Sequence, residues 1–297
     1  MNTTFDYIVV GAGSAGCVIA SRLSENANVS VCLIEAGSSD NTAFVQMPAG
    51  VAASVPYGIN SWHYNTVAQK ELNNRCGFMP RGKVLGGSSS INAMVYIRGN
   101  KYDYDQWAAN GNSGWDYDSL LPYFIKAENN KTFTNSELHG TQGPLHVQEL
   151  NEPSPVNQCF LNACVEQGVS LNNDINATEQ QGARLSQVTQ HNGERCSAAK
   201  AYLTPHLKRA NLTVLTNSHV NKVIINNNMA QGVQIERNKQ VVNLYANNEV
   251  ILSAGAINSP QLLMLSGVGP SNHLHAHNIK VIVPLEGVGA NLHDHLP

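Results

Sequence analysis

The sequence is poor in charge and has no long apolar run. Only 13% of its residues are charged, about half of the usual share of roughly 25%. The net charge is −3, and no long basic run occurs. This excludes a protein that binds nucleic acid by neutralising phosphates, so no nucleic-acid partner is predicted. No uninterrupted run of about 18 apolar residues occurs, so no membrane-spanning helix is predicted.

Paired cysteines and a basic N-terminus are also missing. The six cysteines are scattered without a CxxC pair, and Met1–Asp6 contains neither Lys nor Arg. This pattern favours reduced, mostly packed thiols in a cytoplasmic protein over a disulfide scaffold. It does not resemble a signal peptide. The chain has 297 residues, 42% of them apolar, which is enough for roughly two domains.

A glycine-rich turn follows the first apolar run. Phe5–Val10 is typical of a strand, and the sequence GAGSAG follows it at Gly11–Gly16. Apolar residues then recur at helical spacing over 14–26. A second strand over 29–34 ends at Glu35. This order of strand, glycine turn, helix, strand and acid predicts a Rossmann-like α/β unit.

The residue types of this motif can each be explained by the binding of a dinucleotide. Gly11 permits the tight turn, Gly13 lets the backbone approach a pyrophosphate, and Gly16 lets helix and strand pack closely. The free N–H groups of the helix start favour phosphate. Glu35 lies 19 residues beyond Gly16, where its carboxylate can accept hydrogen bonds from ribose hydroxyls. The motif predicts FAD or NAD and disfavours NADP. The predicted contacts here are Gly11, Gly13, Ser14, Ala15, Gly16, Glu35 and Ala36.

A second glycine cluster lies at Arg81–Met94. Three glycines and three serines fall within 82–90, flanked by Val84, Leu85 and Ile91. These apolar residues would have no role in a flexible linker, so we expect a backbone that passes close to a flat ligand. The run that follows, Met94–Ile97, is expected to be buried.

This segment resembles the first signature of the glucose–methanol–choline (GMC) flavin oxidoreductases. The matching positions are Gly82-Lys83, Leu85–Ser89, Ile91-Asn92, Tyr96, Gly99 and Asp105. The second signature is matched at Gly255-Ala256, Ser259-Pro260, Leu262-Leu263 and Ser266–Gly269. The resemblance covers essentially the whole chain. It is nearest to the choline dehydrogenase and aliphatic-alcohol dehydrogenase branch.

The resemblance implies FAD and oxidation of the CH–OH group of a small alcohol, choline or an aliphatic alcohol, with hydride transfer to flavin N5. It implies a quinone or an electron carrier as acceptor. Some members attach FAD through a histidine where this chain has Ile91, so non-covalent FAD is predicted. The further implied contacts are Trp62 in a flavin-covering lid, Arg81, Gly82, Val84, Gly86, Gly87, Ser88, Asn92, Ala93, Met94, Val95, Val220, Ala254, Gly255 and Asn291.

The resemblance also implies the domain organisation. Residues 1–100 and 191–297 are expected to form an α/β FAD-binding domain, with a parallel sheet and a β-meander crossover. Residues 101–190 are expected to begin an α+β substrate domain. Short apolar runs in the second part predict strands at 212–215, 220–225, 232–235, 241–245 and 250–252, and then a helix over 259–266.

The base of the family's reaction is a histidine in a C-terminal region. No match to that motif occurs in this sequence, so no catalytic residue is predicted and the catalytic region is expected to be absent. A non-catalytic or truncated FAD-binding fragment is the alternative, and a separate C-terminal piece is a candidate partner. The resemblance places His293–His295 beside the flavin phosphates. Membrane contact is expected to be at most peripheral, at the inner face.

Two further groups of titratable residues need an interpretation. His273, His275 and His277 alternate as metal ligands on a strand would. Their flanks resemble a surface helix and turn instead, so no metal site is predicted. Separately, Glu128, Asp174 and Glu194 stand alone in the sequence and are expected to be solvated.

Overall fold

The chain folds into two compact units in a computed structural model that describes residues 3–294. The first unit is Met1–Ile91 with Ser197–Pro297, and the second is Asn92–Cys196. These divisions fall near the expected boundaries at 100 and 190 without coinciding with them. The assignment of one part to cofactor binding and the other to substrate binding stays a prediction.

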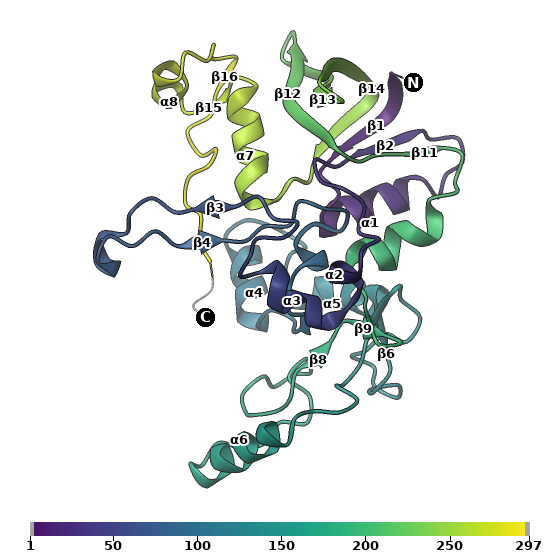
Figure 1. Cartoon of the computed structure of the whole chain (residues 1–297), viewed down its shortest axis with the longest axis vertical. Coiled ribbons are helices and arrows are strands. Elements are labelled where there is room, and N and C mark those ends of the chain that lie inside the picture. The colour runs from purple at the N-terminus through teal and green to yellow at the C-terminus, as the bar shows by residue number, and fades with distance from the viewer. Residues whose placement is uncertain (1–2, 295–297) are drawn as a thin grey trace. The chain divides into compact units, whose positions relative to one another are not determined.

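A six-stranded sheet forms the centre of the first unit, in the order β11-β2-β1-β14-β13-β12 (Figure 1). Its strands are β1 (Thr4–Val10), β2 (Val31–Ile34), β11 (Leu212–Leu215), β12 (Ser218–Asn226), β13 (Met229–Arg237) and β14 (Gln240–Leu252). The strands β11, β2, β1 and β14 are parallel, whereas β14, β13 and β12 form an antiparallel meander. The predicted α/β class, with a parallel sheet and a meander, is confirmed.

The strand β14 joins the two parts of the sheet. Tyr245 pairs with Thr4 on one side and with Gly232 on the other. The sequence predicted two strands here, separated between 245 and 250, and this is wrong. The polar stretch in between stays in the strand because its backbone pairs with β1, where Phe5 lies opposite Ala246. Backbone pairing decides strand continuity here, rather than the apolar pattern.

Asparagine residues make the turns of the meander. Asn227 and Asn228 connect β12 to β13 with φ angles of 50° and 59°, and Asn238 and Lys239 connect β13 to β14 with 51° and 61°. Two successive positive φ angles are characteristic of the type I′ turn, whose twist matches that of a hairpin. The predicted Asn-rich turn after β12 is therefore confirmed.

The central strands are covered on both faces. All four residues of β2 are buried, as are Ile8, Val9 and Val10 at the end of β1. Parallel strands covered on both faces need such continuous apolar runs. Each fully buried aliphatic side chain stabilises the fold by about 1.5–3 kcal/mol. This core holds the carboxyl ends of β1 and β2 in place, where the glycine turn and Glu35 begin.

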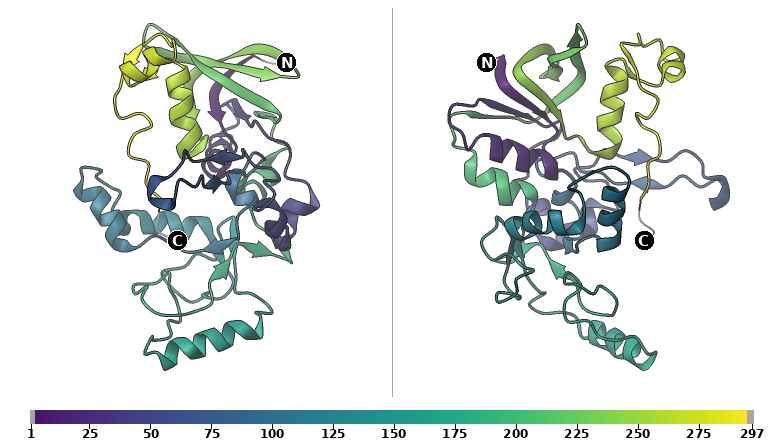
Figure 2. Two further views of the ribbon diagram at one scale, coloured as in Figure 1. Left: turned by 60° about the vertical axis from the view of Figure 1, so that its left-hand side comes forward. Right: turned by 180° about the vertical axis from the view of Figure 1, so that it is seen from behind.

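The first unit has five helices in its described residues. They are α1 (Ser14–Leu23), α2 (Ala43–Gln46), α3 (Val51–Ser54), α7 (Gly255–Leu265) and α8 (Ser271–Ala276). Of these, α1 packs on β1 and β2. A π-helical turn (Ala199–Leu203) runs beside α1, and α7 packs against β12 (Figure 2). Short 3₁₀ turns lie at Pro48–Gly50, Lys70–Leu72, Gly87–Ser90 and Thr204–His206. Two small sheets pair β3 (Tyr64–Asn65) with β4 (Phe78–Met79) and β15 (Val268–Gly269) with β16 (Val283–Pro284).

Helical boundaries differ from the prediction at one place. The helix α7 begins at Gly255, four residues before the predicted start at Ser259. The early turn escaped prediction because Gly255–Asn258 contains one large apolar residue, Ile257, and therefore shows no apolar period. His273 and His275 lie on α8 and His277 follows its last residue, so the predicted surface helix and turn is confirmed.

The second unit has short elements joined by long loops. Its helices are α4 (Lys101–Ala109), α5 (Tyr117–Ala127) and α6 (Pro155–Glu166). Its strand pairs are β5 (Val95–Tyr96) with β8 (Gln187–Val188), β6 (Glu128–Asn130) with β7 (Leu145–Val147), and β9 (Gln190–His191) with β10 (Glu194–Arg195). Within residues 3–294, none of the helices is long and apolar enough to cross a membrane.

Several burial predictions fail. Val95 and Ile97 are exposed and Met94 is buried, because backbone alternation turns successive side chains of this run to opposite sides. Glu128, expected in solvent, is fully buried, because residues distant in sequence supply its partners. Asp174 is partly buried for the same reason.

The remaining predictions on exposure have mixed outcomes. Glu194 is exposed, as expected. None of the six cysteines, all of which lie in the described part of the chain, forms a disulfide. Cys17, Cys32 and Cys196 are buried, whereas Cys76 and Cys159 are exposed. The prediction of packed thiols therefore holds for the three buried cysteines and not for the two exposed ones.

Candidate functional site

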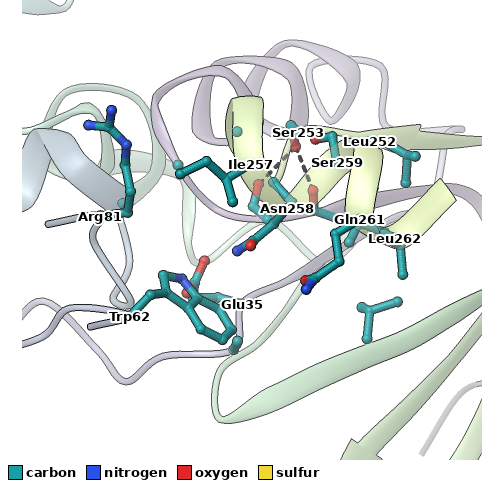
Figure 3. Close-up of a pocket in the computed structure, with 18 of the residues that line it drawn as sticks. Glu35, Trp62, Arg81, Leu252, Ser253, Ile257, Asn258, Ser259, Gln261 and Leu262 are labelled. Carbon is teal, nitrogen blue, oxygen red and sulfur yellow. Dashed lines mark hydrogen bonds between the residues drawn. The ribbon is translucent and has the colours of Figure 1, made fainter. Parts of the chain in front are cut away.

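A cavity of about 540 Å³ opens in the first unit at the carboxyl ends of β1, β2 and β14 (Figure 3). The last residues of these strands, Val10, Ile34 and Leu252, lie in its wall. The strand β1 lies between β2 and β14. The chain leaves β1 through α1 to β2, and it leaves β14 through α7. Open α/β sheets bind ligands at such a switch point.

The predicted glycine turn forms the floor of this cavity. Gly11 has a φ of +92°, and its N–H donates to Ile34 O at 2.8 Å. A Cβ atom placed at Gly16 would lie 1.9 Å from Gly11 O. Only glycine therefore lets α1 start so close to β1, as the sequence predicts. Gly16 itself packs behind the cavity wall.

Two backbone positions leave room for a ligand. A Cβ at Gly13 would meet only Ser253 O, at 3.8 Å, and one at Gly255 would meet no atom within 4 Å. Both residues line the cavity. They lie at the starts of α1 and α7, and no side chain caps either helix. The uncapped N–H groups and the helix dipoles suit an anion such as a pyrophosphate.

Glu35 lies beside the glycine turn, with only 5% of its surface exposed. Its Oε2 accepts the Ala12 N–H and its Oε1 accepts the Gly37 N–H, each at 2.9 Å. Burial raises the pKa of this carboxyl above its ordinary value, although the two N–H bonds oppose the shift. Figure 3 shows the Glu35 side chain in the cavity near Trp62. Its remaining acceptor capacity suits the hydroxyls of a ribose.

The second glycine cluster packs directly onto the first. The Gly86 N–H donates to Ala12 O at 2.7 Å, and a Cβ at Gly87 would lie 2.7 Å from Gly13 Cα. Gly86 and Gly87 have φ angles of +86° and +55°. The Gly82 N–H donates to Ser88 Oγ at 3.1 Å. The segment therefore passes close to the first glycine turn, and its glycines permit this close approach.

One wall of the cavity is aromatic and belongs to residues 60–83, which we call the strap. The Trp62 and Tyr64 rings are parallel, with centroids 6.0 Å apart, and Lys83 Nζ lies 4.4 Å from the Trp62 ring centroid. The Tyr64 hydroxyl donates a hydrogen bond to Asn258 Oδ1 on α7. His219 of β12 lies against Trp62, and burial and the charge of Lys83 lower the pKa of its imidazole.

Most of the predicted contacts in the first unit meet in this one cavity. Its lining includes Gly11, Gly13, Ser14, Ala15, Glu35, Ala36, Trp62, Arg81, Gly82, Gly87, Ser88, Val220, Ala254 and Gly255. Val84 and Gly86 are buried behind it. Asn291 is exposed and does not line it.

The other predicted contacts lie elsewhere. Asn92, Ala93, Met94 and Val95 belong to the second unit, where Asn92 Oδ1 accepts a hydrogen bond from the buried Arg195 guanidinium at 2.9 Å. Their contact with a flavin stays a prediction. Asp294 lies 3.9 Å from the Arg81 guanidinium, and His295 lies outside the described residues.

Sequence reasoning missed several residues of the cavity wall, and three of them carry polar side chains close to predicted contacts. His219, Ser253 and Asn258 all line it. Each lies next to or within a few residues of a predicted contact, so this nearness in the sequence could have identified it. Ser253 Oγ donates toward Val10 O and Gly11 O, at 2.9 and 2.8 Å. It therefore ties the start of α7 to the glycine turn.

Comparisons with known proteins show which proteins the chain is similar to. The family model described as GMC oxidoreductase matches residues 5–297. The alcohol dehydrogenase [acceptor] of Pseudomonas putida is 46% identical over 98% of this chain and 53% of its own length. The mitochondrial choline dehydrogenase of Homo sapiens is 44% identical over 98% of this chain and 50% of its own length.

Solved structures give the same result. Pyridoxine 4-oxidase from Mesorbium loti superposes with a TM-score of 0.90 at 33% identity, over 95% of this chain and 55% of that one. An FAD-dependent oxidoreductase from Chaetomium thermophilum superposes with a TM-score of 0.89 at 32% identity, over 95% and 51%. The chain spans about half the length of the relatives that it matches.

Proposed function

Because this chain belongs to the GMC oxidoreductase family, we propose that its cavity binds FAD and that it serves the oxidation of the CH–OH group of a small alcohol. The observation that carries the proposal is the open backbone at Gly13, at the uncapped start of α1 and beside the buried Glu35 carboxylate. These three features suit a pyrophosphate and the adjoining ribose.

Different residues of the cavity would bind different parts of FAD. The Gly11–Gly16 turn and Glu35 would hold the ADP half of FAD, and Val220 lies in the wall where the adenine is expected. The Arg81–Ser88 segment would support the pyrophosphate and the flavin ring. FAD supplies the hydride acceptor of the reaction, and the protein positions it and excludes water.

We propose that the cofactor is held without a covalent bond. Ile91 occupies the position of the attaching histidine in some members of the family, and its side chain has no nucleophilic atom. It is packed into a small apolar cluster with Val45 and Val84. FAD would then be held only by non-covalent contacts with the residues of the cavity.

The proposed substrate follows from the names of the relatives, and the proposed acceptor follows from the resemblance to this branch of the family. An alcohol dehydrogenase [acceptor] and choline dehydrogenases point to an aliphatic alcohol or choline as the substrate. We propose a quinone or an electron carrier as the acceptor. A cytoplasmic location, peripheral contact with the inner face of a membrane, and a separate C-terminal piece as partner belong to the same proposal.

Purification of the chain with FAD tests the cofactor. We expect a flavin absorbance spectrum that stays with the folded protein and leaves it on acid precipitation. Flavin that remains in the precipitate would contradict non-covalent binding, and bound NAD without flavin would contradict the whole proposal.

Gly13→Ala, whose added methyl group has space in the free protein but occupies the pyrophosphate position, should abolish loading with FAD. Gly287→Ala is the matched control, because Gly287 also has open space around it and lies outside the cavity.

Dye reduction with choline and with aliphatic alcohols tests the activity. It should be measured on the loaded chain alone and with the second half of the Pseudomonas putida relative supplied as a separate chain. Alcohol-dependent reduction in either case supports the oxidoreductase. Bound FAD without turnover in both cases supports the alternative, an FAD-binding fragment without a catalytic histidine.

A further inference from the structure

A buried cluster of charged side chains lies in the second unit, and none of its residues lines the cavity of the first unit. The Arg98, Glu128 and His139 side chains are at most 2% exposed, and that of Asp174 is 17% exposed. Arg98 Nη2 lies 2.6 Å from Glu128 Oε2. His139 Nδ1 lies 2.9 Å from Glu128 Oε1, and His139 Nε2 lies 2.8 Å from Asp174 Oδ2. The imidazole therefore lies between two carboxyl groups.

The neighbouring amide shows which atoms carry protons. Asn130 Oδ1 accepts two backbone N–H groups, at 2.9 and 3.0 Å, which fixes the orientation of the amide. The two protons on its nitrogen are directed to Glu128 Oε1 at 2.6 Å and to Gln187 Oε1 at 3.1 Å. No proton remains for His139 Nδ1, although the two nitrogens are 3.2 Å apart. His139 Nδ1 therefore has to donate its own proton to Glu128.

The other ring nitrogen of His139, Nε2, also faces a group that can only accept a hydrogen bond. Asp174 Oδ1 accepts the Asn176 N–H at 3.0 Å, which leaves Oδ2 for the imidazole. An ionised carboxylate only accepts hydrogen bonds. His139 Nε2 must then donate as well. An imidazole that donates from both nitrogens is the charged imidazolium.

We propose that His139 is held as a buried imidazolium between Glu128 and Asp174, and that the tetrad it forms with Arg98 is a pH-sensitive lock on the fold of the second unit. Two positive and two negative groups make the tetrad electrically neutral. Buried charges are tolerated only when they are paired and hydrogen-bonded in this way. Loss of the imidazolium proton would leave two carboxylates facing a neutral ring.

The lock ties together segments that are distant in the sequence. Glu128 lies in β6, His139 lies in the loop before β7, and the Arg98 N–H donates to Asn176 Oδ1 at 2.8 Å across 78 residues. The described sheets of this unit have two strands each, and isolated two-stranded sheets are marginally stable. The buried polar cluster therefore supplies much of the long-range order between these segments.

Other charged groups near the cluster do not replace the imidazolium. The Phe133 ring packs on His139 with centroids 4.9 Å apart, and the Arg184 guanidinium lies 5.3 Å from the Phe133 ring centroid. Arg184 is paired with Glu149 at 2.7 Å. Within the described residues, the Tyr96 and Tyr117 side chains also hydrogen-bond Arg98. Both are phenols, so the charged groups of the cluster are the four of the tetrad.

The pKa shifts give the pH window of the lock. Burial lowers the pKa of His139, but the hydrogen bonds and charges of Glu128 and Asp174 raise it above its ordinary value of 6.5. Burial raises the pKa of Glu128, but the hydrogen bonds from His139 and Asn130 hold it below its ordinary value of 4.5. The contribution of His139 to stability is therefore complete below pH 6.5 and is lost as the pH rises through its raised pKa. The contribution of Glu128 is complete above pH 4.5 and is lost as the pH falls through its lowered pKa.

Nitrogen NMR of the full chain tests the charge state directly. The His139 ring nitrogens are assigned by comparison with His139→Gln, and at neutral pH both should have imidazolium shifts. A neutral tautomer would overturn the inference. In Asp174→Asn, which removes one of the two carboxylates, the midpoint of the His139 titration should fall to a lower pH. An unchanged midpoint would equally count against the lock.

Hydrogen exchange tests the effect on the fold. Protection factors of amides in 128–147 should fall on the order of tenfold or more as the pH rises from about 6 to about 9, while those of β1 and β2 stay constant. In His139→Gln the protection should already be low at pH 6 and should no longer depend on pH. His275→Gln, a change at an exposed histidine of α8, is the control and should keep the wild-type profile. Equal protection across this range in the wild type would contradict the proposal.

Discussion

At the scale of single residues, Glu35 combines two tasks. Its carboxylate accepts backbone N–H groups from Ala12 in the first glycine turn and from Gly37 after β2. It also lines the cavity. The group that would bind the ribose therefore also holds the turn that would bind the pyrophosphate. A substitution here changes both the shape and the charge of the site.

We predict that Glu35→Gln weakens FAD binding by about tenfold or more, since a hydrogen bond to a charged group contributes about 1.5–3 kcal/mol. The pKa of Glu35 is raised by burial, so in the wild type the affinity should also fall as the pH is lowered through that pKa and the carboxylate is protonated. Fluorescence titration with FAD at several pH values measures both effects. In Glu35→Gln the acid loss of affinity should disappear, and its persistence would assign the pH dependence to another group.

Gly13 and Gly16 should respond differently to the same added methyl group. At Gly16 the Cβ would clash with Gly11 O, whereas at Gly13 it has space. We predict that Gly16→Ala lowers the free energy of unfolding by about 1–3 kcal/mol or more. Gly13→Ala should cost less than about 1 kcal/mol. Urea denaturation without FAD measures the difference, and equal losses in the two variants would show that the space at Gly13 is needed by the fold itself.

At the scale of elements, the strap contacts β12 through the Trp62 and His219 rings and α7 through Tyr64. Its two arms pair through Trp62 N–H and Arg81 O at 2.9 Å and through Lys83 N–H and Asn60 O at 2.6 Å. The Tyr64 hydroxyl is bonded to Asn258 of α7. This bond joins an irregular segment to a helix that is packed on the sheet. It is therefore suited to control how fast the cavity opens.

We predict that Tyr64→Phe speeds the release of FAD, because it removes the bond to Asn258 and keeps the ring that stacks on Trp62. One net hydrogen bond of about 0.5–1.5 kcal/mol corresponds to roughly a 2- to 10-fold faster rate. Stopped-flow dilution of the loaded protein into a flavin scavenger gives the rate. The control is Tyr57→Phe, at a ring that is 76% exposed. If both variants release FAD at the wild-type rate, the bond does not restrain the strap.

At the scale of the whole molecule, FAD binding should stabilise the chain by mass action. We predict a gain of about 2.7 kcal/mol in the free energy of unfolding of the first unit at an FAD concentration of 100 times Kd. Differential scanning fluorimetry with increasing FAD measures the rise in the unfolding temperature. Gly13→Ala should show no rise, and NAD at the same concentration should have no effect on the wild type. A larger rise with NAD than with FAD would reverse the assignment of the cofactor.

The sequence by itself determined the first half of the site. The spacing of Gly11, Gly13 and Gly16 and the position of Glu35 are local features, because one strand, one turn and one helix place them. The same holds for the second glycine cluster, whose glycines reflect the need for close backbone approach. Such patterns are readable because their geometry depends on residues that are neighbours in the chain.

Features that depend on contacts between residues far apart in the sequence were decided only by the tertiary structure. Glu128 is a solitary acid in the sequence, but Arg98, His139 and Asn130 surround it after folding. The strand β14 continues through a polar stretch because β1 pairs with it. Asn258 meets Tyr64 across 194 residues. The free energy of a buried charge or of a sheet pair depends on which groups surround it, and these groups come together only when the chain folds.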